Sequence, residues 1–130
     1  MDGSRIVILV ADDEELVRNM IAVIVRSDGY HVLIASNGVE ALDLSRRYRG
    51  HIDLLISDIL MPSMTGIELA KVLTIERPTI KVMLVSGSTE GLIPAGCHFV
   101  AKPFTTVVLQ KRVSESGRLL TDAQTAASPV

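Results

Sequence analysis

One short stretch, residues 52–58, limits what this chain can fold into more than any other part of the sequence. It reads Ile-Asp-Leu-Leu-Ile-Ser-Asp, an apolar run of strand-forming residues that ends on the carboxylate of Asp58. Pro62 follows closely and prevents a central strand from continuing. A strand that is apolar at almost every position is buried on both faces, which is typical of a parallel strand inside an α/β sheet. Because ligands bind beyond the carboxyl ends of such strands, a binding site is expected around Asp58.

Strand-like and helix-like segments alternate along the rest of the chain. Four further apolar runs predict strands, at residues 6–11, 31–35, 80–85 and 98–101. Helical spacing of apolar residues follows each of the first three strands, and Thr105 can cap a last helix that runs to about Leu120. In the first helix, the side chains expected to share the inward stripe are Leu16, Met20, Val23 and Ile24.

This alternation predicts the fold class. The chain has 130 residues, of which 48% are hydrophobic and 22% charged, enough to build one well-cored domain. We expect a three-layer α/β sandwich around a doubly wound, five-stranded parallel sheet with right-handed crossovers. With the strand order 2-1-3-4-5, the carboxyl ends of the strands converge on one crevice. The domain is expected to span residues 1–120, with a flexible tail over 121–130.

The regular alternation breaks between Ser86 and Lys102. Lys102 lies only 16 positions after Ser86, and Gly91, Pro94 and Gly96 interrupt the segment. Glycine and proline both disfavour a helix interior, so the fourth helix is expected to be shortened or missing.

The overall composition excludes several classes of protein. A net charge of -2 provides no basic surface, so nucleic-acid binding by this chain is not expected. The single cysteine, Cys97, cannot form an internal disulfide, which suits a reducing compartment. The apolar run near the start is too short for export or membrane anchoring. These features predict a cytoplasmic protein without membrane partners.

Four of the five expected strands end on side chains that could bind one hard cation and one anion. In chain order these side chains are Asp12 and Asp13, Asp58, Ser86, and Lys102. Three carboxylates around a crevice raise one another's pKa unless a cation lies among them, and such oxygen ligands select Mg²⁺. The ammonium of Lys102 can neutralise a phosphoryl group, and the Ser86 hydroxyl can donate to it. No histidine or cysteine is placed to act as nucleophile, which leaves the central carboxylate, Asp58.

Each of these residues also has an ordinary structural interpretation. Asp12 and Asp13 could cap the helix that follows them, and Asp58 could be a turn residue. Ser86 could be a loop serine and Lys102 a solvated loop cation. Their coincidence at the carboxyl ends of strands favours a functional site.

The residues around these positions resemble the receiver domain of two-component response regulators. The resemblance covers the chain from Ile6 to about Leu120, and its motifs are Val10-Ala11-Asp12-Asp13-Glu14, the run from Leu55 to Gly66, Val85-Ser86-Gly87 and Val100-Ala101-Lys102-Pro103-Phe104. It implies a flavodoxin-like fold and a bacterial phosphorelay function. Asp58 would accept a phosphoryl group from the phosphohistidine of a sensor histidine kinase or a phosphotransfer protein. The chain would then be a signalling domain rather than an enzyme, although it assists its own phosphorylation and dephosphorylation.

The resemblance also implies a metal shell and a switch. Asp13 and Asp58 would bind Mg²⁺ directly, Asp12 largely through water, and the backbone carbonyl of Leu60 would complete the shell. Lys102 would contact the phosphoryl group, through a loop in which the bond to Pro103 is cis.

Two further positions would respond to phosphorylation. Ser86 would move toward the new anion, and Phe99 would turn inward, although an aromatic residue on this strand could equally belong to the core.

The output of such a domain is left open by the sequence. Family members usually carry a helix in the segment between Ser86 and Lys102, on the face where a downstream protein or a second copy docks, and that face is altered here. An α/β phosphatase with Asp58 as nucleophile would want an acid where Leu60 stands. A flavin- or nucleotide-binding module would want a glycine-rich loop after the first strand. A pseudo-receiver that only binds a partner would not need the complete set of acids.

Overall fold

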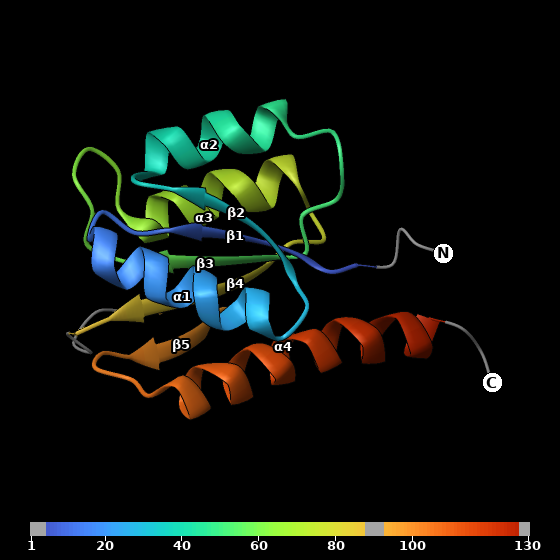
Figure 1. Ribbon diagram of the computed structural model, residues 1–130. Helices are drawn as coiled ribbons and strands as arrows, with labels where there is room; N and C mark the ends of the chain where they lie inside the picture. The colour runs from blue at the N-terminus through green and yellow to red at the C-terminus, as the bar shows by residue number, and fades with distance from the viewer. Residues whose placement is uncertain (1–4, 88–92, 128–130) are drawn as a thin grey trace.

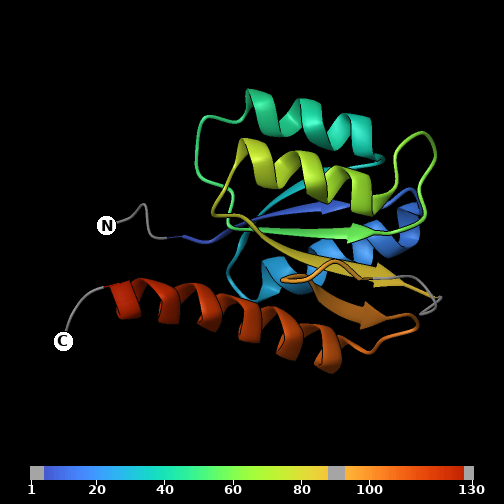
Figure 2. The ribbon, with the colours of Figure 1, turned by 180° about the vertical axis from the view of Figure 1, so that it is seen from behind.

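A five-stranded parallel sheet of order β2-β1-β3-β4-β5 forms the centre of the molecule. The computed structural model describes residues 5–87 and 93–127, and the side chains of 5–87 and 93–116. The strands are β1 (Val7–Ala11), β2 (His31–Ala35), β3 (Leu54–Asp58), β4 (Lys81–Ser86) and β5 (His98–Ala101). The helices are α1 (Glu15–Ser27), α2 (Gly38–Arg47), α3 (Gly66–Glu76) and α4 (Thr106–Ala127). Figure 1 shows α1 and α4 on one face of the sheet and α2 and α3 on the other, and Figure 2 shows this arrangement from behind. The expected fold class is confirmed.

Alternate side chains of the strands build two separate cores. On β1, Leu9 packs with α2 and α3, whereas Ile8 and Val10 pack with α1 and α4. On β3, Leu55 likewise packs with α2 and α3, and Ile56 packs with α1 and α4. Because helices cover both faces of the sheet, both sets of side chains are apolar, and the strands read as continuous apolar runs.

The segment between β4 and β5 contains no helix in the part that the structure describes, residues 87 and 93–97. Instead, a turn closed by the N–H of Cys97 and the carbonyl of Pro94, 3.1 Å apart, leads into β5. Gly96 adopts a φ of 87° in this turn, a backbone conformation that favours glycine. The expectation that the helix between Ser86 and Lys102 is shortened or missing is therefore confirmed for the described residues.

Helix α1 turns a different face to the sheet from the one that its spacing predicted. Of the expected stripe only Ile24 is buried, while Leu16 and Val23 are 84% and 63% exposed. The helix buries Ile21, Ala22, Ile24 and Val25 instead. Apolar residues surround more than half of this helix, so their period alone does not select the buried face. The inward stripe predicted from Leu16 was therefore wrong, because three of its four side chains, those of Leu16, Met20 and Val23, are exposed.

Helix α4 begins where the sequence indicated and ends later. The hydroxyl of Thr105 accepts the N–H of Val108 at 3.1 Å, which is the expected cap. The helix continues to Ala127, beyond the expected end near Leu120, because no glycine or proline lies between these two positions. The domain boundary at residue 120 and the flexible tail stay predictions. Across the described residues, no helix combines the length and apolar character needed to cross a membrane.

Candidate functional site

The sheet order brings three carboxylates together at the carboxyl ends of β1 and β3. Ala11 is paired with Ser57 in the sheet, so the next residues, Asp12 and Asp58, lie side by side. One carboxylate oxygen from each of Asp12, Asp13 and Asp58 lies within 4.8 Å of the others. Asp12 is 1% exposed and Asp58 8%, whereas Asp13 is exposed. The structure thus forms the acidic cluster that the sequence predicted.

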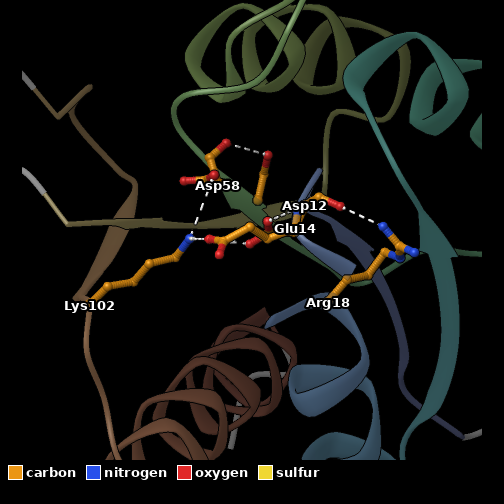
Figure 3. A network of polar contacts seen from close by, with 6 residues as sticks. Asp12, Glu14, Arg18, Asp58 and Lys102 are labelled. Carbon is orange, nitrogen blue, oxygen red and sulfur yellow. Dashed lines mark hydrogen bonds and ion pairs between the residues drawn. The ribbon is translucent and has the colours of Figure 1, made fainter. Parts of the chain in front are cut away.

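Lys102 reaches this cluster from the loop between β5 and α4, as Figure 3 shows. Its Nζ lies 3.4 Å from Asp12 Oδ2, 3.6 Å from Asp58 Oδ2 and 3.7 Å from Glu14 Oε1. The backbone N–H of Lys102 donates to the carbonyl of Ser86 at 2.9 Å, which ties the lysine to the end of β4. The Lys102–Pro103 peptide bond is cis, as the sequence resemblance implied.

The charges in the cluster are not balanced by protein groups in this arrangement. Burial raises the pKa of Asp58, Lys102 opposes this, and Asp12 and Asp13 raise it further. Burial also raises the pKa of Asp12, against the N–H of Glu14 and the ammonium of Lys102. Burial lowers the pKa of Lys102, but the carboxylates of Asp12, Asp58 and Glu14 outweigh it and raise that pKa overall. Several carboxylates facing one ammonium form a donor set that fits a hard divalent cation.

The backbone around Asp58 is held by two small residues. The hydroxyl of Ser57 donates to the carbonyl of Asp58 at 2.8 Å, and the N–H of Gly66 donates to the carbonyl of Ile59 at 2.8 Å. A Cβ atom on Gly66 would lie 2.1 Å from the carbonyl oxygen of Asp58. Only glycine therefore allows the start of α3 to approach the end of β3 so closely. Gly66 was quoted in a motif but given no role from the sequence.

The remaining predicted residues occupy the expected part of the molecule. Ser86 is buried at the end of β4, and Leu60 is exposed in the loop after β3. Phe99 is half-buried on β5 and packs against the core on the side of α2 and α3. The roles assigned to these three residues stay predictions.

Sequence reasoning missed two residues that contact the cluster. Glu14 approaches Lys102, and Arg18 donates from Nη1 to the backbone carbonyl of Asp12 at 3.0 Å. The sequence signal for Arg18 is its position one helical turn after Glu14, which returns its side chain toward the end of β1.

The fold and the site define a doubly wound α/β domain with an acidic pocket faced by a lysine from the last loop. A family model described as "Response regulator receiver domain" matches residues 8–114. The chain belongs to this family.

Individual relatives agree with that assignment. The chain is 37% identical over 121 residues to the sensor kinase CckA of Brucella abortus, covering 88% of this chain and 13% of that protein. It is 31% identical over 119 residues to the probable transcriptional regulatory protein TcrX of Mycobacterium tuberculosis, covering 85% and 50%. The chain thus spans half or less of these two curated relatives.

Solved receiver structures have the same fold. The receiver domain of the hybrid histidine kinase CckA matches with a TM-score of 0.75 and 38% identity, covering 85% of this chain and 97% of that one. The response regulator TrrA of Thermotoga maritima, solved in complex with Mg(2+)-BeF, matches with a TM-score of 0.74 and 30% identity, covering 85% and 98%.

Proposed function

We propose that this domain accepts a phosphoryl group on Asp58 from the phosphohistidine of a sensor histidine kinase or a phosphotransfer protein. The observation that carries this proposal is the position of Asp58 Oδ2, 3.6 Å from Lys102 Nζ, within the carboxylate cluster. A carboxylate oxygen of Asp58 would form the new bond to phosphorus as the phosphorus–nitrogen bond breaks. The electron pair of that bond stays on the histidine nitrogen, which then takes up a proton.

The donor set of the cluster supports Mg²⁺ as the cofactor. Asp13 and Asp58 would hold the ion directly, Asp12 largely through water, and the carbonyl of Leu60 would complete its shell. When bound, the ion would supply positive charge that offsets the carboxylates and the phosphoryl oxygens. Lys102 would supply further positive charge.

Phosphorylation on Asp58 would be read out by a change in shape. The Ser86 hydroxyl would donate to the phosphoryl group, and Phe99 would turn inward from its half-buried position. Attack of water on phosphorus would release phosphate and restore the Asp58 carboxylate. The output would be a downstream protein partner or a second copy of this chain, in the cytoplasm.

Exposed apolar side chains beside Asp58 support a docking site for the phosphodonor protein. A partner must place its phosphohistidine against Asp58, so it must also contact the surface around the pocket. The apolar side chains of Leu16 and Met20 are exposed on α1 there. An apolar cavity of about 270 Å³ adjoins Lys102 and is lined by Val17, Met20, Lys102, Pro103 and Phe104. We assign this face to the sensor kinase or phosphotransfer protein.

The central test uses the chain alone. With Mg²⁺ and acetyl phosphate, intact mass spectrometry should show one added phosphoryl group on the wild type and none on Asp58→Asn or in EDTA. Asp43→Asn is the matched control, because Asp43 is an exposed carboxylate paired with Arg47 on α2. If neither acetyl phosphate nor purified sensor kinases modify the wild type, the pseudo-receiver alternative replaces this proposal.

A second test separates docking from chemistry. Met20→Glu should slow transfer from a phosphorylated kinase about 10-fold, since it places a charge in an apolar contact. Its reaction with acetyl phosphate should be unchanged. Ile75→Glu is the control, because Ile75 is also an exposed apolar residue but lies on α3. Equal slowing by both variants would contradict the assigned face.

A further inference from the structure

Arg18 contacts the acidic cluster without being part of it. Its guanidinium Nη1 donates to the backbone carbonyl of Asp12 at 3.0 Å, and Figure 3 shows the side chain reaching back from α1 to the end of β1. Arg18 is half-buried, so this hydrogen bond is partly shielded from water. This hydrogen bond goes to the main chain of Asp12 and not to a carboxylate of the cluster.

The contact with Arg18 is one of four that fix Asp12. The N–H of Asp12 donates to the carbonyl of Ala35 at 3.2 Å, which anchors the residue to the end of β2. One carboxylate oxygen accepts the N–H of Glu14 at 2.9 Å, and the other lies 3.4 Å from Lys102 Nζ. Arg18 donates to the remaining polar group of Asp12, its backbone carbonyl, and Asp12 is almost completely buried.

The carbonyl of Asp12 needs such a donor. It follows the last residue of β1, so the sheet does not supply a partner by continuing the strand, and an unpaired buried carbonyl is costly. Freed from Arg18, the peptide after Asp12 could rotate toward water. That rotation would turn the N–H of Asp13 and change the path of the chain into Glu14, whose N–H orients the Asp12 carboxylate.

We propose that Arg18 is a positioning residue for the metal site, which sets the affinity for Mg²⁺ by fixing the backbone of Asp12. This inference rests on the proposed function, because it assumes that the carboxylate cluster holds Mg²⁺. Arg18 acts through Asp12 and touches neither the ion nor the phosphoryl group.

Positioning and simple charge make opposite predictions for the removal of Arg18. As a nearby cation, Arg18 repels a divalent ion, so its removal would tighten Mg²⁺ binding if charge were its only effect. As a positioning residue, its removal should weaken binding about 10-fold, the usual scale for a group that orients a metal ligand. Whether Mg²⁺ binding becomes weaker or tighter therefore shows whether Arg18 acts by positioning or by charge.

The experiment is a calorimetric Mg²⁺ titration of the intact chain, which suits a sequence without tryptophan. Arg18→Met should raise the dissociation constant about 10-fold, and Arg18→Lys, which keeps the charge and a group that can donate, should recover part of the loss. Arg26→Met is the matched control, because Arg26 is an exposed arginine in the last turn of the same helix. It should bind Mg²⁺ like the wild type. Unfolding midpoints in EDTA show whether each variant is folded at the titration temperature.

The possible results separate this inference from the proposed function. Unchanged or tighter binding by folded Arg18→Met overturns the positioning role, while phosphorylation of the wild type on Asp58 still stands. A wild type that neither binds Mg²⁺ nor takes up a phosphoryl group overturns both. Weaker binding by Arg18→Met, with partial recovery by Arg18→Lys, supports the positioning role.

Discussion

Asp53 and Asp58 stand at the two ends of the same stretch of chain, and their surroundings differ in kind. Just before β3, the Asp53 carboxylate accepts the N–H of Val7 at 2.8 Å and lies 3.3 Å from His51 Nε2. At the end of β3, Asp58 faces the carboxylates of Asp12 and Asp13. The first aspartate joins neighbouring strands, whereas the second is held among like charges. The amino edge of the sheet is thus built for stability, and the carboxyl edge for binding.

The rest of the amino edge follows the same pattern. The guanidinium of Arg77, at the end of α3, donates to the hydroxyl and carbonyl of Ser45, each at 2.8 Å. It also donates to the carbonyls of Tyr48 and Gly50, each at 2.9 Å. One cation therefore satisfies the end of α2 and the loop that follows it. At the carboxyl edge, by contrast, several carboxylates share the single ammonium of Lys102, which cannot neutralise all of them.

The largest expected loss of stability comes from a substitution that crowds the backbone at the carboxyl edge. Gly66→Ala should lower the free energy of unfolding by about 3 kcal/mol, because the new Cβ would collide with the carbonyl of Asp58. Urea denaturation measures this loss, and phosphorylation should slow as Asp58 shifts. Gly87→Ala is the control at the same edge, since nothing lies within 4 Å of a Cβ there. Equal losses from the two substitutions would contradict the close approach of α3.

At the amino edge, removal of Arg77 should separate stability from function. Arg77→Met should destabilise the fold by about 2 kcal/mol through loss of its charged hydrogen bonds, in urea denaturation. The rate of phosphorylation by acetyl phosphate should stay unchanged below the unfolding transition, because the site lies at the opposite edge. Arg47→Met removes an exposed ion pair with Asp43 and should cost no more than about 0.5 kcal/mol. A slower phosphorylation of Arg77→Met would show that the two edges are coupled.

The two aspartates themselves should respond with opposite signs. In EDTA, Asp53→Ala should lower the free energy of unfolding by about 1–2 kcal/mol, because the N–H of Val7 loses its acceptor. Asp58→Ala should raise it by about 0.5 kcal/mol, because it removes a buried carboxylate from beside two others. Paired urea titrations measure both changes. The comparison fails if both substitutions destabilise the apo domain to the same extent.

The sequence predicted the carboxyl edge better than the amino edge, for a physical reason. Asp12, Asp58 and Lys102 each follow an apolar strand, so the parallel topology alone brings them together. Arg77 contacts partners 27 to 32 positions earlier through a long side chain, and no local pattern predicts that reach.

The face of α1 was predicted wrongly for a related reason. Its apolar residues offer more than one stripe, and the choice between them depends on how the chain leaves β1. Periodicity shows that a helix is amphipathic, but the buried side is fixed by contacts that are distant in sequence.

Glu40 tests whether ionised carboxylates destabilise the fold along the whole carboxyl edge or only in the cluster around Asp58. Hydrogen bonds from the N–H and hydroxyl of Ser36 lower the pKa of Glu40, and Arg18 lowers it further, whereas the pKa of Asp58 is raised. A carboxylate with a lowered pKa stabilises the fold above its unfolded pKa and loses this effect as the pH falls through its folded pKa.

Glu40→Gln removes that charge but keeps an oxygen that can accept both hydrogen bonds. It should therefore lower the free energy of unfolding by a few tenths of a kcal/mol, about the value of an exposed charged contact, at pH 7. The difference from the wild type should be constant down to about pH 5 and should close below it, as Glu40 becomes protonated. Urea titrations across this range measure it. A difference that widens on acidification would mean that the ionised Glu40 destabilises the fold, and the unfavourable charge would then extend beyond Asp12, Asp13 and Asp58.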